Sequence, residues 1–150
     1  MLLYQIILTG HLVASTVWVG AVFMGTFIDW PSARASVPER RFPFRFIVGQ
    51  GRRVFYSVYS GITILWVTGL ALVVLRPPTT GWELSAVLFK VAALFFMTAF
   101  TLYGTLRTWP KLQLATDEEA YHHYKFYMYR AVGTFTFGLL AAIAGLWVRP

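Results

Sequence analysis

The sequence predicts an all-α integral membrane protein, a four-helix bundle with both termini on the outer side of the membrane. The first observation is composition: 57% of the 150 residues are hydrophobic and only 13% are charged, whereas a typical soluble domain is about a quarter charged. The other two are the arrangement of the apolar residues in long runs and the position of the basic residues between them. The length allows one domain, residues 1–150. The absence of cysteine excludes disulfide scaffolds, iron–sulfur clusters and thiol catalysis.

The apolar residues form four runs long enough to cross a bilayer, which takes about 20 residues in a helix. The first run contains His11 and the third contains Lys90, while the second and fourth carry no charge. The runs are too long for strands and do not alternate. The first lacks a basic start and a small-residue cleavage site, so we interpret it as a retained span rather than a signal peptide. The predicted spans are residues 3–28, 54–75, 84–106 and 130–148.

The basic residues predict the orientation of these spans. The segment Trp30–Arg53 has a single acidic residue, Glu39, and six arginines: Arg34, Arg40, Arg41, Arg45, Arg52 and Arg53. The segment Arg107–Arg130 holds four basic residues: Arg107, Lys111, Lys125 and Arg130. The second loop has only Arg76, and the C-terminal end has Arg149. By the positive-inside rule the first and third loops are cytoplasmic and both termini face outward, in the inner (plasma) membrane. The basic loops favour anionic lipid, and nucleic-acid binding is not expected.

Each basic loop has a predicted local structure. In the first loop, Phe42, Phe44 and Phe46 alternate with arginines, a pattern typical of a segment lying in the headgroup layer. In the third, Thr116 and Glu119 have the spacing of a capping box and predict a helix start. His122 and His123 follow it, and because adjacent helical residues point about 100° apart, we expect surface histidines rather than a metal site.

His11 and Lys90 are the two residues most costly to place in a bilayer. A cation at mid-bilayer costs roughly 2.5–3.5 kcal/mol on insertion scales, so such residues usually face the bundle interior and have a function. Counted from the outer ends of their helices, both lie some 8–9 Å deep at about 1.5 Å per residue, and they can share one layer. Two structural alternatives remain: Lys90 can snorkel to the headgroups, and His11 can be a neutral imidazole hydrogen-bonded to a neighbouring helix.

Haem is the first cofactor that this layer suggests, because histidine is a common axial ligand and a helix bundle offers a slot for it. Lys90 or a loop arginine would hold the propionates. Met24 and Met97 lie too far along their helices to reach iron on His11, so we expect five-coordinate haem, ligation by Lys90, or a site completed by a second copy in a homo-oligomer. Copper is the alternative, but without cysteine or a methionine pair His11 alone is a poor cuprous site.

The sequence also resembles a known family. His11-Leu-Val-Ala-Ser-Thr-Val-Trp18-Val-Gly20 resembles the first-helix signature of the HemJ family of membrane protoporphyrinogen IX oxidases, and of the wider clan that includes copper-resistance protein D domains. Gly51-Arg52-Arg53-Val-Phe-Tyr56 resembles the start of the second helix. Further likenesses are Trp82 and Lys90 in the third helix, and Tyr129-Arg130 and Trp147-Val148-Arg149-Pro150 at the start and end of the fourth.

This resemblance implies haem b and a six-electron oxidation of protoporphyrinogen, with His11 and Lys90 as the catalytic pair and His11 on the metal. It also places Trp18 at the cofactor, and Arg52, Arg53 and Arg130 at porphyrin carboxylates. The chain departs from the family after Arg130, where Ala-Val-Gly-Thr-Phe stands in place of an Asn-Glu pair.

The sequence therefore predicts a haem b-binding membrane redox protein resembling HemJ. Its expected partners are membrane lipid, a porphyrin substrate and a quinone or other membrane acceptor of electrons. Two alternatives stay open: a copper-transport or copper-resistance protein, and a non-catalytic subunit of a membrane complex.

Overall fold

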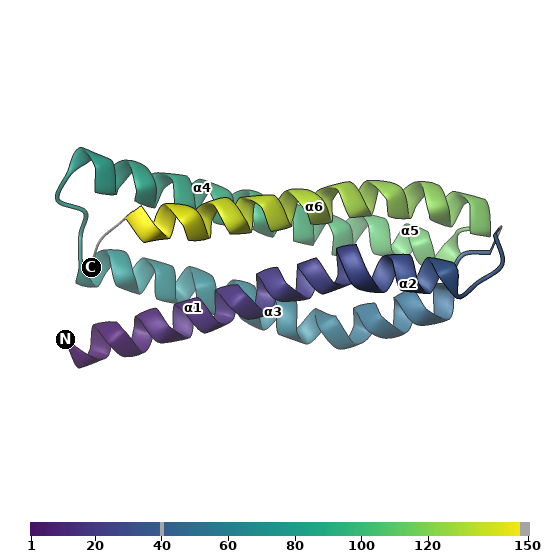
Figure 1. Ribbon diagram of the computed structural model, residues 1–150, viewed down its shortest axis with the longest axis horizontal. Helices are drawn as coiled ribbons and strands as arrows, with labels where there is room; N and C mark the ends of the chain where they lie inside the picture. The colour runs from purple at the N-terminus through teal and green to yellow at the C-terminus, as the bar shows by residue number, and fades with distance from the viewer. Residues whose placement is uncertain (40, 148–150) are drawn as a thin grey trace.

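The computed structural model describes residues 1–39 and 41–147, with only the backbone of Trp147, and it folds into four long helical rods (Figure 1). The first rod joins α1 (Leu2–Phe23), the π-helical turn η1 (Met24–Asp29) and α2 (Trp30–Ala35). The second is α3 (Phe44–Leu75). The third joins α4 (Gly81–Tyr103), the π-helical turn η2 (Gly104–Thr108) and α5 (Trp109–Leu114), and the fourth is α6 (Asp117–Trp147). The all-α prediction is confirmed for these residues, and Arg40 and Val148–Pro150 lie outside them.

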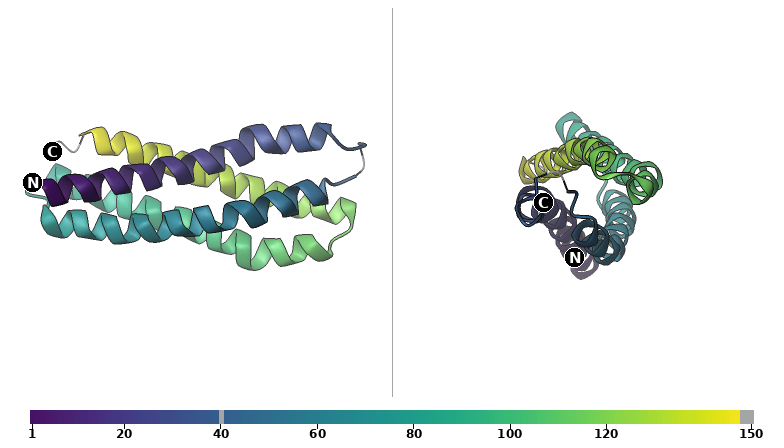
Figure 2. Two further views of the ribbon diagram at one scale, coloured as in Figure 1. Left: turned by 90° about the horizontal axis from the view of Figure 1, so that it is seen from below. Right: turned by 90° about the vertical axis from the view of Figure 1, so that its right-hand side faces the viewer.

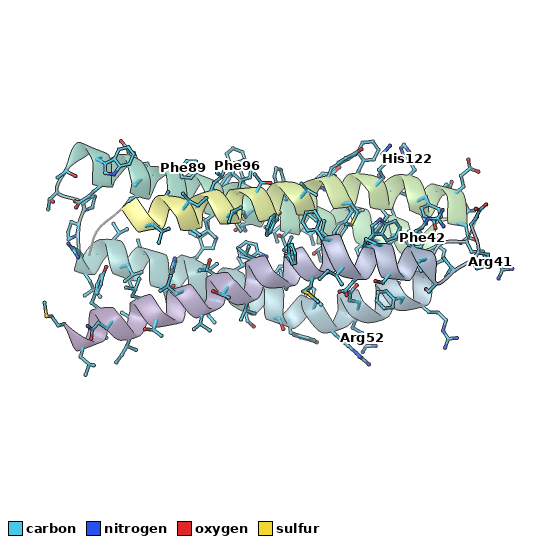
Figure 3. All side chains as sticks on the ribbon, in the orientation of Figure 1. Arg41, Phe42, Arg52, Phe89, Phe96 and His122 are labelled. Carbon is cyan, nitrogen blue, oxygen red and sulfur yellow. The ribbon has the colours of Figure 1, made fainter. Side chains whose placement is uncertain are left out.

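All four rods are long and apolar enough to cross a membrane. Their outward faces carry large apolar side chains: Leu70 is 69% exposed, Val67 64% and Leu88 60%. Figure 3 shows Phe89 and Phe96 pointing away from the bundle. Such a surface would be unstable in water but suits contact with lipid chains. The prediction of a multi-pass membrane protein agrees with this surface.

The rods run alternately up and down. α1 packs against α3, α4 packs against α6, and α1 and α6 join the two pairs; the end-on view in Figure 2 shows the rods arranged around one axis. The start of α1, the connection 76–80 and the end of α6 lie at one end of the bundle, called here the terminal end (Figure 1). Connections 36–43 and 115–116 lie at the other, called here the arginine-rich end.

The helices extend further than the predicted spans. Four segments outside the predicted spans are also helical, namely 30–35, 44–53, 107–114 and 117–129. The headgroup-layer prediction is wrong for Phe42, which is 4% exposed and packs against Trp30, Tyr121 and Tyr124. The helices continue beyond the apolar runs, and most of the arginines of these segments lie on those helix ends. The connections between the helices are therefore short. At the start of α6, Thr116 donates its backbone N–H to the Glu119 carboxylate at 2.9 Å, in line with the predicted helix start.

The first and third rods share an internal repeat. Gly25-Thr26-x-x-x-Trp30-Pro31 and Gly104-Thr105-x-x-x-Trp109-Pro110 occupy η1 and η2 and the residues just after them. In each segment, the backbone N–H of the tryptophan donates to the backbone carbonyl of the glycine five residues earlier. A proline in a regular helix collides with the carbonyl four residues before it, and the wider π turn relieves this collision. Both rods therefore pass Trp-Pro without breaking.

The interior contains two apolar clusters. The middle cluster consists of Ala14, Trp18, Val58, Ile62, Leu65 and Met97. The second cluster, at the arginine-rich end, consists of Ala33, Phe42, Ile47, Leu112, Ala120 and Tyr124. They fix the rods at mid-height and at one end. A cavity lies between them, because members of both clusters line it.

Candidate functional site

His11 lies on α1, half-buried between the helices, and is hydrogen-bonded to a neighbouring helix. Its Nδ1 lies 2.7 Å from Oγ1 of Thr68 on α3, and the Thr68 hydroxyl donates to the Ile64 carbonyl at 2.5 Å. Because the only hydroxyl proton of Thr68 goes to Ile64, its oxygen must accept from His11 Nδ1–H. The neutral imidazole then carries its free lone pair on Nε2, which is the arrangement of a histidine that ligates a metal.

Lys90 on α4 occupies the equivalent position in the other half of the bundle. His11 lies 14 residues before Gly25, and Lys90 lies 14 residues before Gly104. The two predicted catalytic residues are therefore brought into one layer toward the terminal end.

Each of these two side chains lies against a glycine of its partner helix. A Cβ at Gly69 on α3 would be 3.4 Å from Cε1 of His11, and a Cβ at Gly145 on α6 would be 3.2 Å from Nζ of Lys90. The two glycines thus leave the room that the imidazole and the ammonium occupy. All four rods contribute to this layer, which we call the His11–Lys90 layer.

The His11–Lys90 layer can give a metal one histidine ligand, but it lacks the further ligands that a metal site built only from protein side chains needs. Within the described residues, no group of three His, Cys, Asp or Glu side chains is placed to hold a metal ion. Met97 is buried in the middle cluster, seven residues further along α4 than Lys90 and about 10 Å deeper. Cuprous ion favours several soft ligands, so the residues of this layer do not fit it. They do fit haem held by one imidazole, with an ammonium available for a carboxylate.

The cavity between the two clusters has a volume of about 530 Å³, within the range usual for small-molecule sites. Both repeats line it, with Gly25 and Thr26 on one side and Gly104 and Thr105 on the other. Eight aromatic side chains also line it: Trp18, Phe55, Tyr56, Tyr59, Phe100, Trp109, Tyr124 and Tyr127. We call it the inner cavity; His11 and Lys90 are not among the residues that line it.

Two buried donors in the inner cavity have no hydrogen-bond partner, Nε1 of Trp18 and Nε of Arg130. Trp18 is fully buried in the middle cluster. Arg130 donates from Nη2 to Oγ1 of Thr108 at 2.6 Å, and its guanidinium stacks over the Tyr103 ring at 4.6 Å. An unpaired buried donor costs about 1–3 kcal/mol. Both donors therefore favour a ligand with acceptor oxygens.

The structure divides the predicted site residues into separate groups. His11 and Lys90 form one layer, while Trp18 and Arg130 line the inner cavity on the far side of the middle cluster. Arg52 touches the rim of that cavity, but its side chain is exposed and points away from the bundle (Figure 3). Arg53 is exposed and does not line the cavity.

The tandem histidines do not form a chelating pair. The rings of His122 and His123 are 6.1 Å apart and steeply inclined, and His122 points away from the bundle (Figure 3). This geometry agrees with the expected surface histidines. His123 lines a second, smaller cavity near the arginine-rich end.

Sequence reasoning missed Thr68 and the repeated turns. Thr68 lies in an apolar run where a lone hydroxyl gives no signal, because its role depends on helix rotation. The repeat was visible as two copies of Gly-Thr-x-x-x-Trp-Pro, and a search for internal similarity would have found it. Comparison with protein-family models, curated proteins and solved structures found no match for this chain.

Proposed function

We propose that this chain is a haem b-binding redox protein of the plasma membrane, similar to the HemJ-type protoporphyrinogen oxidases. The observation that carries the proposal is the hydrogen bond from His11 to Thr68. It leaves Nε2 as the free donor atom of an imidazole held between helices. Haem, when bound, supplies reversible one-electron chemistry at iron.

The chain's own residues then have separable roles. Thr68 keeps the proton of His11 on Nδ1 and fixes the plane of the ring. Lys90 offers a cation for a porphyrin carboxylate in the same layer, where low dielectric strengthens a charge-assisted hydrogen bond. The glycines Gly69 and Gly145 leave the room that the two side chains themselves occupy.

The inner cavity supports binding of a second, oxidisable molecule. A tetrapyrrole is flat, largely apolar and carries carboxylates, which matches an aromatic wall with an unpaired donor of Arg130 at one side. Trp18 contributes a further donor. Conversion of protoporphyrinogen to protoporphyrin removes six electrons and six protons, which three quinones or an equivalent membrane acceptor must take up.

The orientation proposed for this protein has both termini outside the cytoplasm. The connections 36–43 and 115–116 lie at the end where nearly all the basic residues gather, and the connection 76–80 carries only Arg76. Reporter domains fused after Pro150 should be active only in the outer compartment. A fusion active only in the cytoplasm would reverse the orientation.

The visible absorption spectrum of the detergent-purified protein tests the haem proposal. We expect a Soret band, and sharp α and β bands on reduction. His11→Ala should remove the bound haem, whereas the double variant His122→Ala/His123→Ala should keep it, because only His11 lies in a layer without competing water. The opposite pattern would move the site to the arginine-rich end, and a colourless wild-type protein would refute haem binding.

A further inference from the structure

A second cavity, of about 280 Å³, lies between the third rod and α6 near the arginine-rich end. Three basic side chains line it, those of Arg107, Lys111 and Arg130, together with His123. The aromatic residues Tyr103 and Phe126 also line it, and they are 54% and 49% exposed. We call it the basic pocket.

The charge of the basic pocket is not balanced by the residues around it, since no carboxylate lines it. Arg107 and Lys111 are four residues apart, so they lie on the same face of the third rod. Three cations close together repel one another unless an anion joins them. The pocket therefore favours an anionic ligand.

One of these cations is held in place before a ligand arrives. Arg130 donates to Thr108 at 2.6 Å and stacks over Tyr103 at 4.6 Å. A guanidinium fixed in this way loses little freedom when it binds an oxyanion. Thr108 itself belongs to η2, a π-helical turn, and such turns often lie at functional sites.

The first rod shows that the repeated fold does not by itself produce this pocket. Aligning the two Gly-Thr-x-x-x-Trp-Pro segments places Ile28 opposite Arg107 and Ser32 opposite Lys111. Asp29 stands opposite Thr108, and there it accepts a hydrogen bond from Gln50. The cations are thus specific to the second half of the chain.

We propose that the basic pocket binds the phosphate of an anionic phospholipid. It lies at the level where the apolar outer surface of the bundle gives way to charged residues, which is where lipid phosphates are found. The exposed rings of Tyr103 and Phe126 offer apolar contact for the glycerol and the upper acyl chains. This inference does not depend on haem binding.

The test uses the full-length protein, delipidated in detergent, and native mass spectrometry with added phosphatidylglycerol or phosphatidylcholine. The wild-type protein should bind phosphatidylglycerol at least tenfold more tightly than phosphatidylcholine. Arg107→Gln/Lys111→Gln should reduce the affinity for phosphatidylglycerol roughly tenfold or more, since each basic residue near the surface contributes about 1 kcal/mol. Its affinity for phosphatidylcholine should hardly change.

The matched control is Arg41→Gln/Arg45→Gln, which removes the same charge from exposed positions at the same end. It should bind phosphatidylglycerol like the wild-type protein. An equal loss in the control, or no lipid preference in the wild-type protein, would overturn the proposal.

Inorganic phosphate is tested alone by its effect on thermal unfolding. Protection by phosphate equal to that by phosphatidylglycerol would assign the pocket to free phosphate and refute the lipid. A wild-type protein without a preference for phosphatidylglycerol would refute the proposal even if a variant fails to fold.

Discussion

The two halves of the molecule, α1 to α3 and α4 to α6, share a backbone pattern but carry different polar side chains at the matching positions. Each begins with a rod that widens into a π turn at Gly-Thr-x-x-x-Trp-Pro, and each has a glycine facing its buried polar side chain. The first half supplies an imidazole at that position and the second an ammonium. At the π turn, the first half pairs Asp29 with Gln50, and the second pairs Thr108 with Arg130.

The difference indicates a division of labour. The shared backbone pattern produces the inner cavity, because the glycine and threonine of both turns line it. Under the proposed function, the unlike side chains give the two halves different chemistry: a neutral nitrogen for a metal in the first half, and cations for anionic groups in the second. Two histidines or two lysines at these positions would not provide both a metal ligand and a cation.

Among variants that keep His11, replacing the lysine of the pair should have the largest effect on ligand binding. Lys90→Met removes a charge-assisted hydrogen bond in low dielectric, a loss of about 1.5–3 kcal/mol, or roughly tenfold to a hundredfold in affinity for a carboxylated porphyrin. Lys90→Arg keeps the charge and should restore binding better than turnover. Haem titration and anaerobic porphyrinogen oxidation with a quinone measure the two properties. Wild-type values for Lys90→Met would reduce Lys90 to a snorkelling anchor.

The sequence predicted the bundle well because apolar length is a strong signal. It ended the helices too early, because the predicted spans stop where the uncharged apolar runs stop, whereas the helices continue beyond them. The π turns that let the rods continue depend on hydrogen bonds five residues apart, which no hydropathy pattern records. Depth arithmetic placed His11 and Lys90 in one layer, and that layer is present.

The cavities could not be predicted in the same way. Trp18 and Arg130 were selected only through the family resemblance, which grouped them with His11. Trp18 belongs to the middle cluster and Arg130 lines the cavity beyond it, and both positions depend on how each helix is rotated about its axis. Rotation is fixed by side-chain packing, and a nearly uniform apolar run carries little information about it.

The glycines of the two π turns provide a stability test of the same comparison. A Cβ at Gly104 would lie 2.9 Å from Cε2 of Tyr127, whereas a Cβ at Gly25 would meet nothing within 4 Å. Gly104→Ala should therefore lower the free energy of unfolding by about 1–3 kcal/mol through overpacking. Gly25→Ala should raise it by up to about 1 kcal/mol through helix propensity. Thermal unfolding in detergent measures both, and equal effects would show that the two turns are packed alike.

The smallest expected effect concerns Thr68, whose hydroxyl orients the imidazole of the first half. Thr68→Val keeps the shape of the side chain but removes the oxygen that accepts from His11 Nδ1. The loss of one hydrogen bond is worth about 0.5–1.5 kcal/mol, so haem should bind up to roughly tenfold more weakly. The proton of the imidazole is then free to move to Nε2, where it competes with iron. The hydroxyl of Thr63 is the control, because it is exposed and donates only to the Tyr59 carbonyl of its own helix. Thr63→Val should leave haem affinity unchanged, and an equal loss in both variants would mean that Thr68 acts on helix packing rather than on His11.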